Sequence, residues 1–133
     1  MCNICTPTIK GDTDNMAKIM IVDDAAFMRM VIKDILKKNG HEVVAECIDG
    51  LDAVQKYPQF KPELVFMDIV MPNMEGIDAL KKIMQMDPSA RIVMCSSIGQ
   101  QSVVTDALKS GALDFIVKPF DAAKVLEVIG KVI

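Results

Sequence analysis

The sequence has no tryptophan, one tyrosine, one histidine and no long hydrophobic run. A transmembrane helix needs about 18 or more consecutive apolar residues, and every apolar run here is much shorter. No positively charged start is followed by an apolar stretch of about 7–15 residues, so we expect no secretion signal and a cytoplasmic protein. The net charge of −3 argues against nucleic-acid binding through a basic surface.

Four cysteines and a single histidine offer few metal or disulfide partners. Cys2 and Cys5 form one C-x-x-C pair, whereas a structural zinc site needs four ligands. Cys47 and Cys95 lie in apolar runs, where buried thiols behave as small hydrophobic side chains. His41 follows the end of a predicted helix, and we expect it at the surface. We therefore expect neither a disulfide framework nor a metal site at these residues.

The sequence divides into a polar start and a regular remainder. Residues 1–15 follow neither a helical nor a strand period, so we interpret them as a flexible N-terminal tail or an expression remnant. From residue 16 to residue 133, apolar runs alternate five times with segments of helical periodicity. The runs are Ile19–Val22, Val43–Ile48, Leu64–Met67, Arg91–Cys95 and Phe115–Val117. This alternation predicts one α/β domain with a doubly wound parallel sheet of five strands and five helices. In the second helix, we expect Pro58 to end or kink the helix because proline lacks an N–H.

Polar residues follow the apolar runs at the points where the predicted strands end. They are Asp23 and Asp24 after the first run, Asp68 after the third, Ser96 and Ser97 after the fourth, and Lys118 after the fifth. In such sheets, ligands bind beyond the carboxyl ends of the strands, so we expect these side chains to meet there. Helix capping explains any one aspartate or serine alone. Three carboxylates at one edge, however, repel by about 4 kcal/mol per pair at about 4 Å and an effective dielectric constant of about 20. Either protons or a cation must neutralise them. All-oxygen ligands suit Mg²⁺, and an aspartate beside Mg²⁺ can accept a phosphoryl group.

These residues resemble the receiver domain of two-component response regulators, most closely the single-domain CheY-type chemotaxis regulators. The matching motifs are Ile19–Asp24, the stretch 23–29, Met67-Asp68, Met71-Pro72, Gly76, Ser96, Gly99-Gln100-Gln101 and Lys118-Pro119-Phe120. The resemblance spans residues 17–133, and it implies a flavodoxin-like sheet with strand order 2-1-3-4-5.

The resemblance also implies roles for the acidic residues and the lysine. Asp68 would be the phosphoacceptor. Asp24 would bind Mg²⁺ directly, and Asp23 would act mainly through water. The backbone carbonyl of Val70 would be the third protein ligand. Lys118 would pair with the phosphoryl group.

A conformational switch is implied by the remaining matches. Ser96 would donate its hydroxyl to the phosphoryl group, and Ser97 would serve as a small spacer. Phe115 stands at the aromatic position whose ring moves inward in this family. The face formed by the fourth helix, the fifth strand and the fifth helix, about residues 101–132, would then change shape.

The function implied is a phosphorylation-activated signalling switch, not an enzyme with a separate substrate. It would act as a monomer, take its phosphoryl group from a histidine kinase, bind a motor-switch or adaptor protein, and meet an auxiliary phosphatase. Because the sequence ends directly after the last periodic segment, we expect no output domain. The alternatives are a receiver in a phosphorelay or stress pathway, a binding module that is never phosphorylated, and an aspartate-nucleophile phosphatase. Such phosphatases usually need a second aspartate at the position where Val70 stands.

Overall fold

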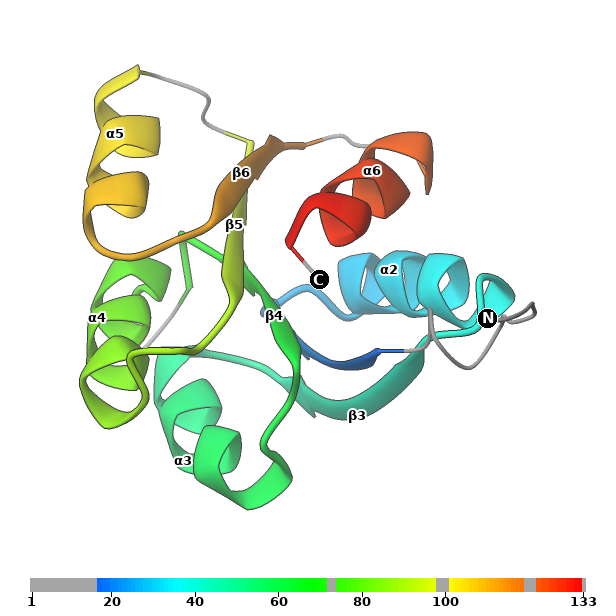
Figure 1. Ribbon diagram of the computed structural model, residues 1–133, viewed down its shortest axis with the longest axis horizontal. Coiled ribbons are helices and arrows are strands. Elements are labelled where there is room, and N and C mark those ends of the chain that lie inside the picture. The colour runs from blue at the N-terminus through cyan, green and yellow to red at the C-terminus, as the bar shows by residue number, and fades with distance from the viewer. Residues whose placement is uncertain (1–16, 72–73, 98–100, 119–121, 133) are drawn as a thin grey trace, which may run out of the picture.

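A five-stranded parallel sheet forms the centre of the computed structural model, which describes residues 17–71, 74–97, 101–118 and 122–132. The strands are β2 (Lys18–Val22), β3 (Glu42–Cys47), β4 (Leu64–Asp68), β5 (Ile92–Ser96) and β6 (Asp114–Val117). Their order across the sheet is β3-β2-β4-β5-β6 (Figure 1), which confirms the predicted order 2-1-3-4-5. The predictions for residues 1–15, Pro72, Gly99, Gln100, Pro119 and Phe120 fall outside the described residues, so the domain boundary at residue 16 stays a prediction.

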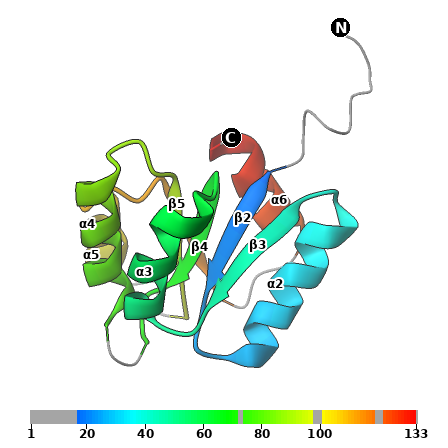
Figure 2. The same cartoon turned by 90° about the horizontal axis from the view of Figure 1, so that it is seen from below.

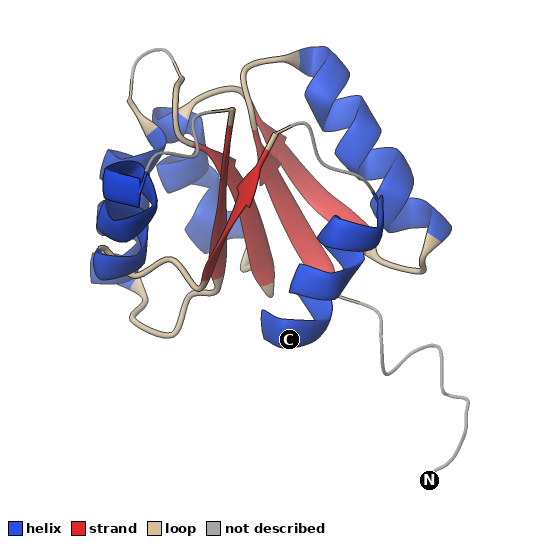
Figure 3. Cartoon of the chain, turned by 90° about the horizontal axis from the view of Figure 1, so that it is seen from above, coloured by secondary structure: helices blue, strands red, loops and turns tan. Residues whose placement is uncertain are grey.

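In the described part of the chain, five helices cover both faces of the sheet. They are α2 (Ala26–Lys38), α3 (Gly50–Phe60), α4 (Gly76–Met86), α5 (Gln101–Lys109) and α6 (Ala122–Val132). Helices α2 and α6 lie on one face, and α3, α4 and α5 lie on the other (Figures 2 and 3). Among the described residues, no helix combines the length and the apolar character that crossing a membrane would need.

Two apolar cores, one on each face, follow from the alternation of side chains along the buried strands. In β2, Ile19 and Ile21 pack with Ile32 and Leu36 of α2 and with residues of α6. The intervening Met20 and Val22 pack on the opposite side against α3, α4 and α5. Because both faces of β2 are covered, a continuous apolar run marks this strand rather than strict alternation with polar residues.

The prediction was that Pro58 would end or kink the second helix, and Pro58 does not end it. Helix α3 continues through Pro58 to Phe60 and ends where Lys61 adopts a left-handed conformation with φ 46°. A hydrogen bond from the Lys61 N–H to the Tyr57 carbonyl, at 2.9 Å, closes the last turn beyond the proline. Tyr57 is itself buried in the core, so tertiary packing holds a turn that local propensity disfavours.

Candidate functional site

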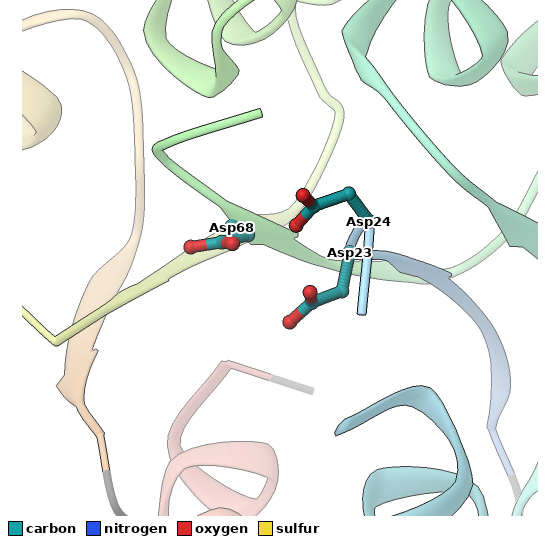
Figure 4. A group of neighbouring side chains, drawn as sticks. All are labelled: Asp23, Asp24 and Asp68. Carbon is teal, nitrogen blue, oxygen red and sulfur yellow. The ribbon is translucent and has the colours of Figure 1, made fainter. Parts of the chain in front are cut away.

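The carboxyl ends of the central strands bring the predicted acidic residues together. Asp23 and Asp24 directly follow β2, and Asp68 is the last residue of β4. One carboxylate oxygen from each aspartate lies within 4.8 Å of the other two (Figure 4). Lys118, which follows β6, places its Nζ 2.7 Å from Oδ2 of Asp23 and 3.5 Å from Oδ2 of Asp68. The four charged residues therefore form a single cluster, as the strand-end pattern predicts.

Asp23 is held through each of its polar groups and is 2% exposed. Its N–H donates to the Cys47 carbonyl of β3 at 3.0 Å, and its carbonyl accepts from Arg29 Nη1 of α2 at 2.6 Å. Its Oδ1 accepts from the Ala25 N–H at 2.9 Å, and its Oδ2 accepts from Lys118. These partners come from β3, from the start of α2 and from the end of β6, so they fix the position of this residue relative to the sheet edge.

The charges in the cluster perturb each other. Burial raises the pKa of the Asp68 carboxyl above its ordinary value, the Lys118 ammonium opposes that rise, and the charge of Asp23 adds to it. Burial disfavours the charged form of Lys118, but the hydrogen bond to Asp23 and the charges of Asp68 and Asp23 outweigh this and raise its pKa. The lysine therefore stays cationic near neutral pH. Three carboxylates and one ammonium leave a formal excess of two negative charges, which a divalent cation would balance.

The donor set also fits a hard divalent cation. All three acidic side chains offer oxygen atoms, the ligand type that Mg²⁺ prefers. Asp24 is exposed, so water can reach the cluster. Bound Mg²⁺ usually keeps several waters, which would complete its octahedral coordination here. Val70, whose carbonyl is the expected third ligand, stands two residues beyond Asp68 and is 55% exposed.

The loop that follows Asp68 is pinned by close backbone contacts. The Ile69 N–H donates to the Cys95 carbonyl at 3.1 Å, and the Gly76 N–H donates to the Ile69 carbonyl at 2.8 Å. A Cβ on Gly76 would overlap the carbonyl oxygen of Asp68, so only glycine fits where α4 begins. This close approach gives the Gly76 of the sequence motif a physical reason.

Ser96 and Phe115 lie on the last two strands, β5 and β6. Ser96 ends β5, is 1% exposed, and accepts a hydrogen bond on its carbonyl from the Lys118 N–H at 2.7 Å. Phe115 on β6 is half-buried and packs against the core beneath α3, α4 and α5. Ser97, expected to be a spacer, is exposed.

Two residues have contacts that the sequence analysis missed. Arg29 appeared only as part of a motif, yet it binds the Asp23 carbonyl and forms an ion pair with Glu46 at 3.4 Å. His41, expected at the surface, is half-buried, and its Nδ1 accepts the N–H of Ala17 at 3.1 Å. An arginine on the inner side of the first helix was the available signal for the first contact, whereas nothing in the local pattern marks the second.

Known proteins resemble this chain over most of its length. The sequence model of the response regulator receiver domain matches residues 19–130. The chain is 65% identical to the chemotaxis protein CheY of Bacillus subtilis over 114 residues, which cover 86% of this chain and 95% of that protein. CheY of Thermotoga maritima is 56% identical over 115 residues, covering 86% and 96% of the two chains. The structure is also similar to a chain in the crystal structure of the CheX–CheY–BeF3–Mg²⁺ complex of Borrelia burgdorferi, with a TM-score of 0.85, 39% identity, and coverage of 86% of this chain and 87% of that one.

Proposed function

Since the chain belongs to the response regulator receiver domain family, we propose that it is a phosphorylation-activated switch of chemotaxis signalling and that Asp68 accepts the phosphoryl group. One observation carries the assignment of the residue. Asp68 stands at the end of the central strand β4 with Asp23 and Asp24 within 4.8 Å and the Lys118 ammonium 3.5 Å away. Asp23 shares these neighbours, but both of its carboxylate oxygens already accept hydrogen bonds, from the Ala25 N–H at 2.9 Å and from Lys118 at 2.7 Å.

The proposed reaction is a phosphoryl transfer to a carboxylate. An oxygen of Asp68 forms the new P–O bond, and the P–N bond of a phosphohistidine donor breaks. The imidazole leaves with the electron pair and takes up a proton. Asp23, Asp24, Asp68 and the Val70 carbonyl would hold Mg²⁺, which when bound offsets the charge of the carboxylates and of the phosphoryl oxygens.

Lys118 has two alternative anionic partners in this scheme. In the structure it lies closer to Asp23, at 2.7 Å, than to Asp68, at 3.5 Å. A phosphoryl group adds about −1.5 to −2 charges at neutral pH, so the ammonium moves toward it. The Lys118 N–H is hydrogen-bonded to the Ser96 carbonyl, so we expect this movement to shift the ends of β5 and β6 together.

The movement of Ser96 and Lys118 toward the phosphoryl group makes room for Phe115 to turn inward. We propose that this reshapes the face made by α5, β6 and α6, to which the target binds. Shifting a two-state equilibrium from 1:99 to 99:1 needs about 5.5 kcal/mol. Several charge-assisted hydrogen bonds at about 1.5–3 kcal/mol each would supply this difference.

The proposed partners follow from the same chemistry. A histidine kinase supplies the phosphoryl group, the monomeric phosphorylated form binds a motor-switch or adaptor protein, and an auxiliary phosphatase shortens the signal. The last of these has support from the relative in B. burgdorferi, whose CheY was crystallised with CheX. The identity of 65% to a chemotaxis protein favours this pathway over a phosphorelay or stress pathway.

The test of the switch compares ¹H–¹⁵N spectra with and without BeF3⁻ and Mg²⁺. Beryllium trifluoride binds a carboxylate oxygen and has the same tetrahedral geometry as a bound phosphoryl group. We expect shifts at Asp68 and Ser96 and along α5, β6 and α6, all of them lost in Asp68→Asn. Shifts confined to the strand ends, with the α5–β6–α6 face unchanged, would contradict the proposed output surface.

A further inference from the structure

Arg29 links the segment that carries Asp23 and Asp24 to β3, the edge strand of the sheet. Its Nη1 donates to the Asp23 carbonyl at 2.6 Å, and its Nε lies 3.4 Å from Oε1 of Glu46 on β3. The Arg29 side chain is 16% exposed, so water competes little for these contacts. A planar guanidinium can serve both partners at once in a fixed geometry, which an ammonium cannot.

Glu46 is itself held firmly in place. It pairs in register with Ile21 of β2, and its carbonyl accepts from Lys56 Nζ at 2.9 Å. Its Oε2 accepts from Lys33 Nζ, one turn along α2 from Arg29, at 3.1 Å. Lys33 lowers the pKa of the Glu46 carboxyl, so this carboxylate remains charged as a partner for the arginine. The chain of contacts thus runs from β3 through Glu46 and Arg29 to the backbone of Asp23.

We propose that Arg29 is a positioning residue for the metal-dependent phosphorylation of Asp68. By fixing the Asp23 carbonyl, it fixes the backbone from which the carboxylates of Asp23 and Asp24 project. The inference rests on the proposed function, but its first readout is cation binding and needs no phosphoryl transfer. Arg29 touches none of the reacting atoms and acts through Asp23.

Positioning and simple electrostatics predict opposite results. A cation close to three carboxylates repels Mg²⁺, so removing its charge alone would tighten Mg²⁺ binding. Removing a positioning residue would weaken binding, because the Asp23 carbonyl, in a residue 2% exposed, loses its charged donor. A hydrogen bond from a charged donor corresponds to roughly one to two powers of ten in an equilibrium constant.

The experiment measures the Mg²⁺ dissociation constant by calorimetry for the wild type, Arg29→Met and Arg29→Lys. Lys38→Met is the matched control, since it removes an exposed cation from the same helix, and its partner Asp34 lies outside this chain of contacts. We expect about tenfold weaker binding for Arg29→Met, an intermediate loss for Arg29→Lys, and a change of less than about twofold for the control. Circular dichroism verifies that each variant is folded. If Arg29→Met does not fold, the Mg²⁺ dissociation constant of Arg29→Lys still decides the test.

A second readout separates positioning from chemistry. The Mg²⁺ concentration that half-saturates phosphorylation by acetyl phosphate should rise with the dissociation constant, while the rate at saturating Mg²⁺ stays within about twofold of wild type. Tighter or unchanged Mg²⁺ binding in Arg29→Met, or wild-type binding in Arg29→Lys, would overturn the inference. If the wild type binds Mg²⁺ but is not phosphorylated, the proposed function is wrong. The Mg²⁺ dissociation constants of the variants still test whether Arg29 positions Asp23. A wild type that binds no Mg²⁺ would overturn both.

Discussion

Replacing Lys118 with methionine tests how strongly the buried ammonium stabilises the acidic cluster. The lysine side chain is 15% exposed, and those of its partners Asp23 and Asp68 are 3% and 11% exposed. Removing one partner of a buried ion pair costs about 3–5 kcal/mol because the remaining charge is left uncompensated. Asp24 at the same sheet edge is exposed, so water reaches the cluster and compensates part of the lost charge, and we expect the lower end, about 3 kcal/mol.

The assay is thermal and urea unfolding followed by circular dichroism, first in EDTA and then in saturating Mg²⁺. A loss of about 3 kcal/mol corresponds to a fall in Tm of about 10–15 °C for a chain of this size. The control is Lys38→Met, whose partner Asp34 is 62% exposed and whose loss should cost less than about 0.5 kcal/mol. Mg²⁺ stabilises any form of the protein that binds it. It should reduce the difference in the free energy of unfolding between Lys118→Met and wild type, because it replaces the missing cation. Equal stability of Lys118→Met and wild type in EDTA, or a gap that Mg²⁺ leaves unchanged, would refute this reasoning.

Three further predictions concern pH, backbone contact and lifetime. Burial lowers the pKa of His41, so the stability that the neutral imidazole contributes is present above pH about 6.5 and is lost as the pH falls below that value through the lowered pKa; urea unfolding of His41→Asn should lack this loss. Gly76→Ala should cost about 1–3 kcal/mol and slow phosphorylation because the new Cβ meets the Asp68 carbonyl, whereas Gly130→Ala in open space should stabilise α6 by about 0.5–1 kcal/mol. Val70 cannot orient water, so the phosphorylated protein should decay slowly; a lifetime of only seconds by intact mass would contradict this.

Much of the fold follows from patterns that local physics fixes. A strand buried on both faces must be apolar throughout, so runs such as Ile19–Val22 identify the central strands directly. The polar residue that ends each run must lie at the sheet edge, which places Asp23, Asp68 and Lys118 together without knowledge of any side-chain conformation. The site could therefore be predicted from spacing as well as from the resemblance.

The features that the sequence analysis missed depend on contacts between distant segments. Pro58 was expected to end or kink a helix, but the helix continues beyond it, held by the burial of Tyr57 and the hydrogen bond from the Lys61 N–H. His41 meets the N–H of Ala17, 24 residues earlier, and no local period encodes that pairing. The pairing of β3 with β2 brings Glu46 next to Arg29, so the ion pair between them could not be predicted without the register of the sheet.

The most direct test of the central claim is the intact mass of the protein after incubation with acetyl phosphate, with and without Mg²⁺, beside Asp68→Asn. Mass is the suitable signal because the chain has no tryptophan to report phosphorylation by fluorescence. We predict a gain of one phosphoryl group that requires Mg²⁺ and is absent from the folded Asp68→Asn variant. No gain by the folded wild type in the presence of Mg²⁺, or an equal gain in the variant, would contradict the assignment of Asp68 as the phosphoacceptor.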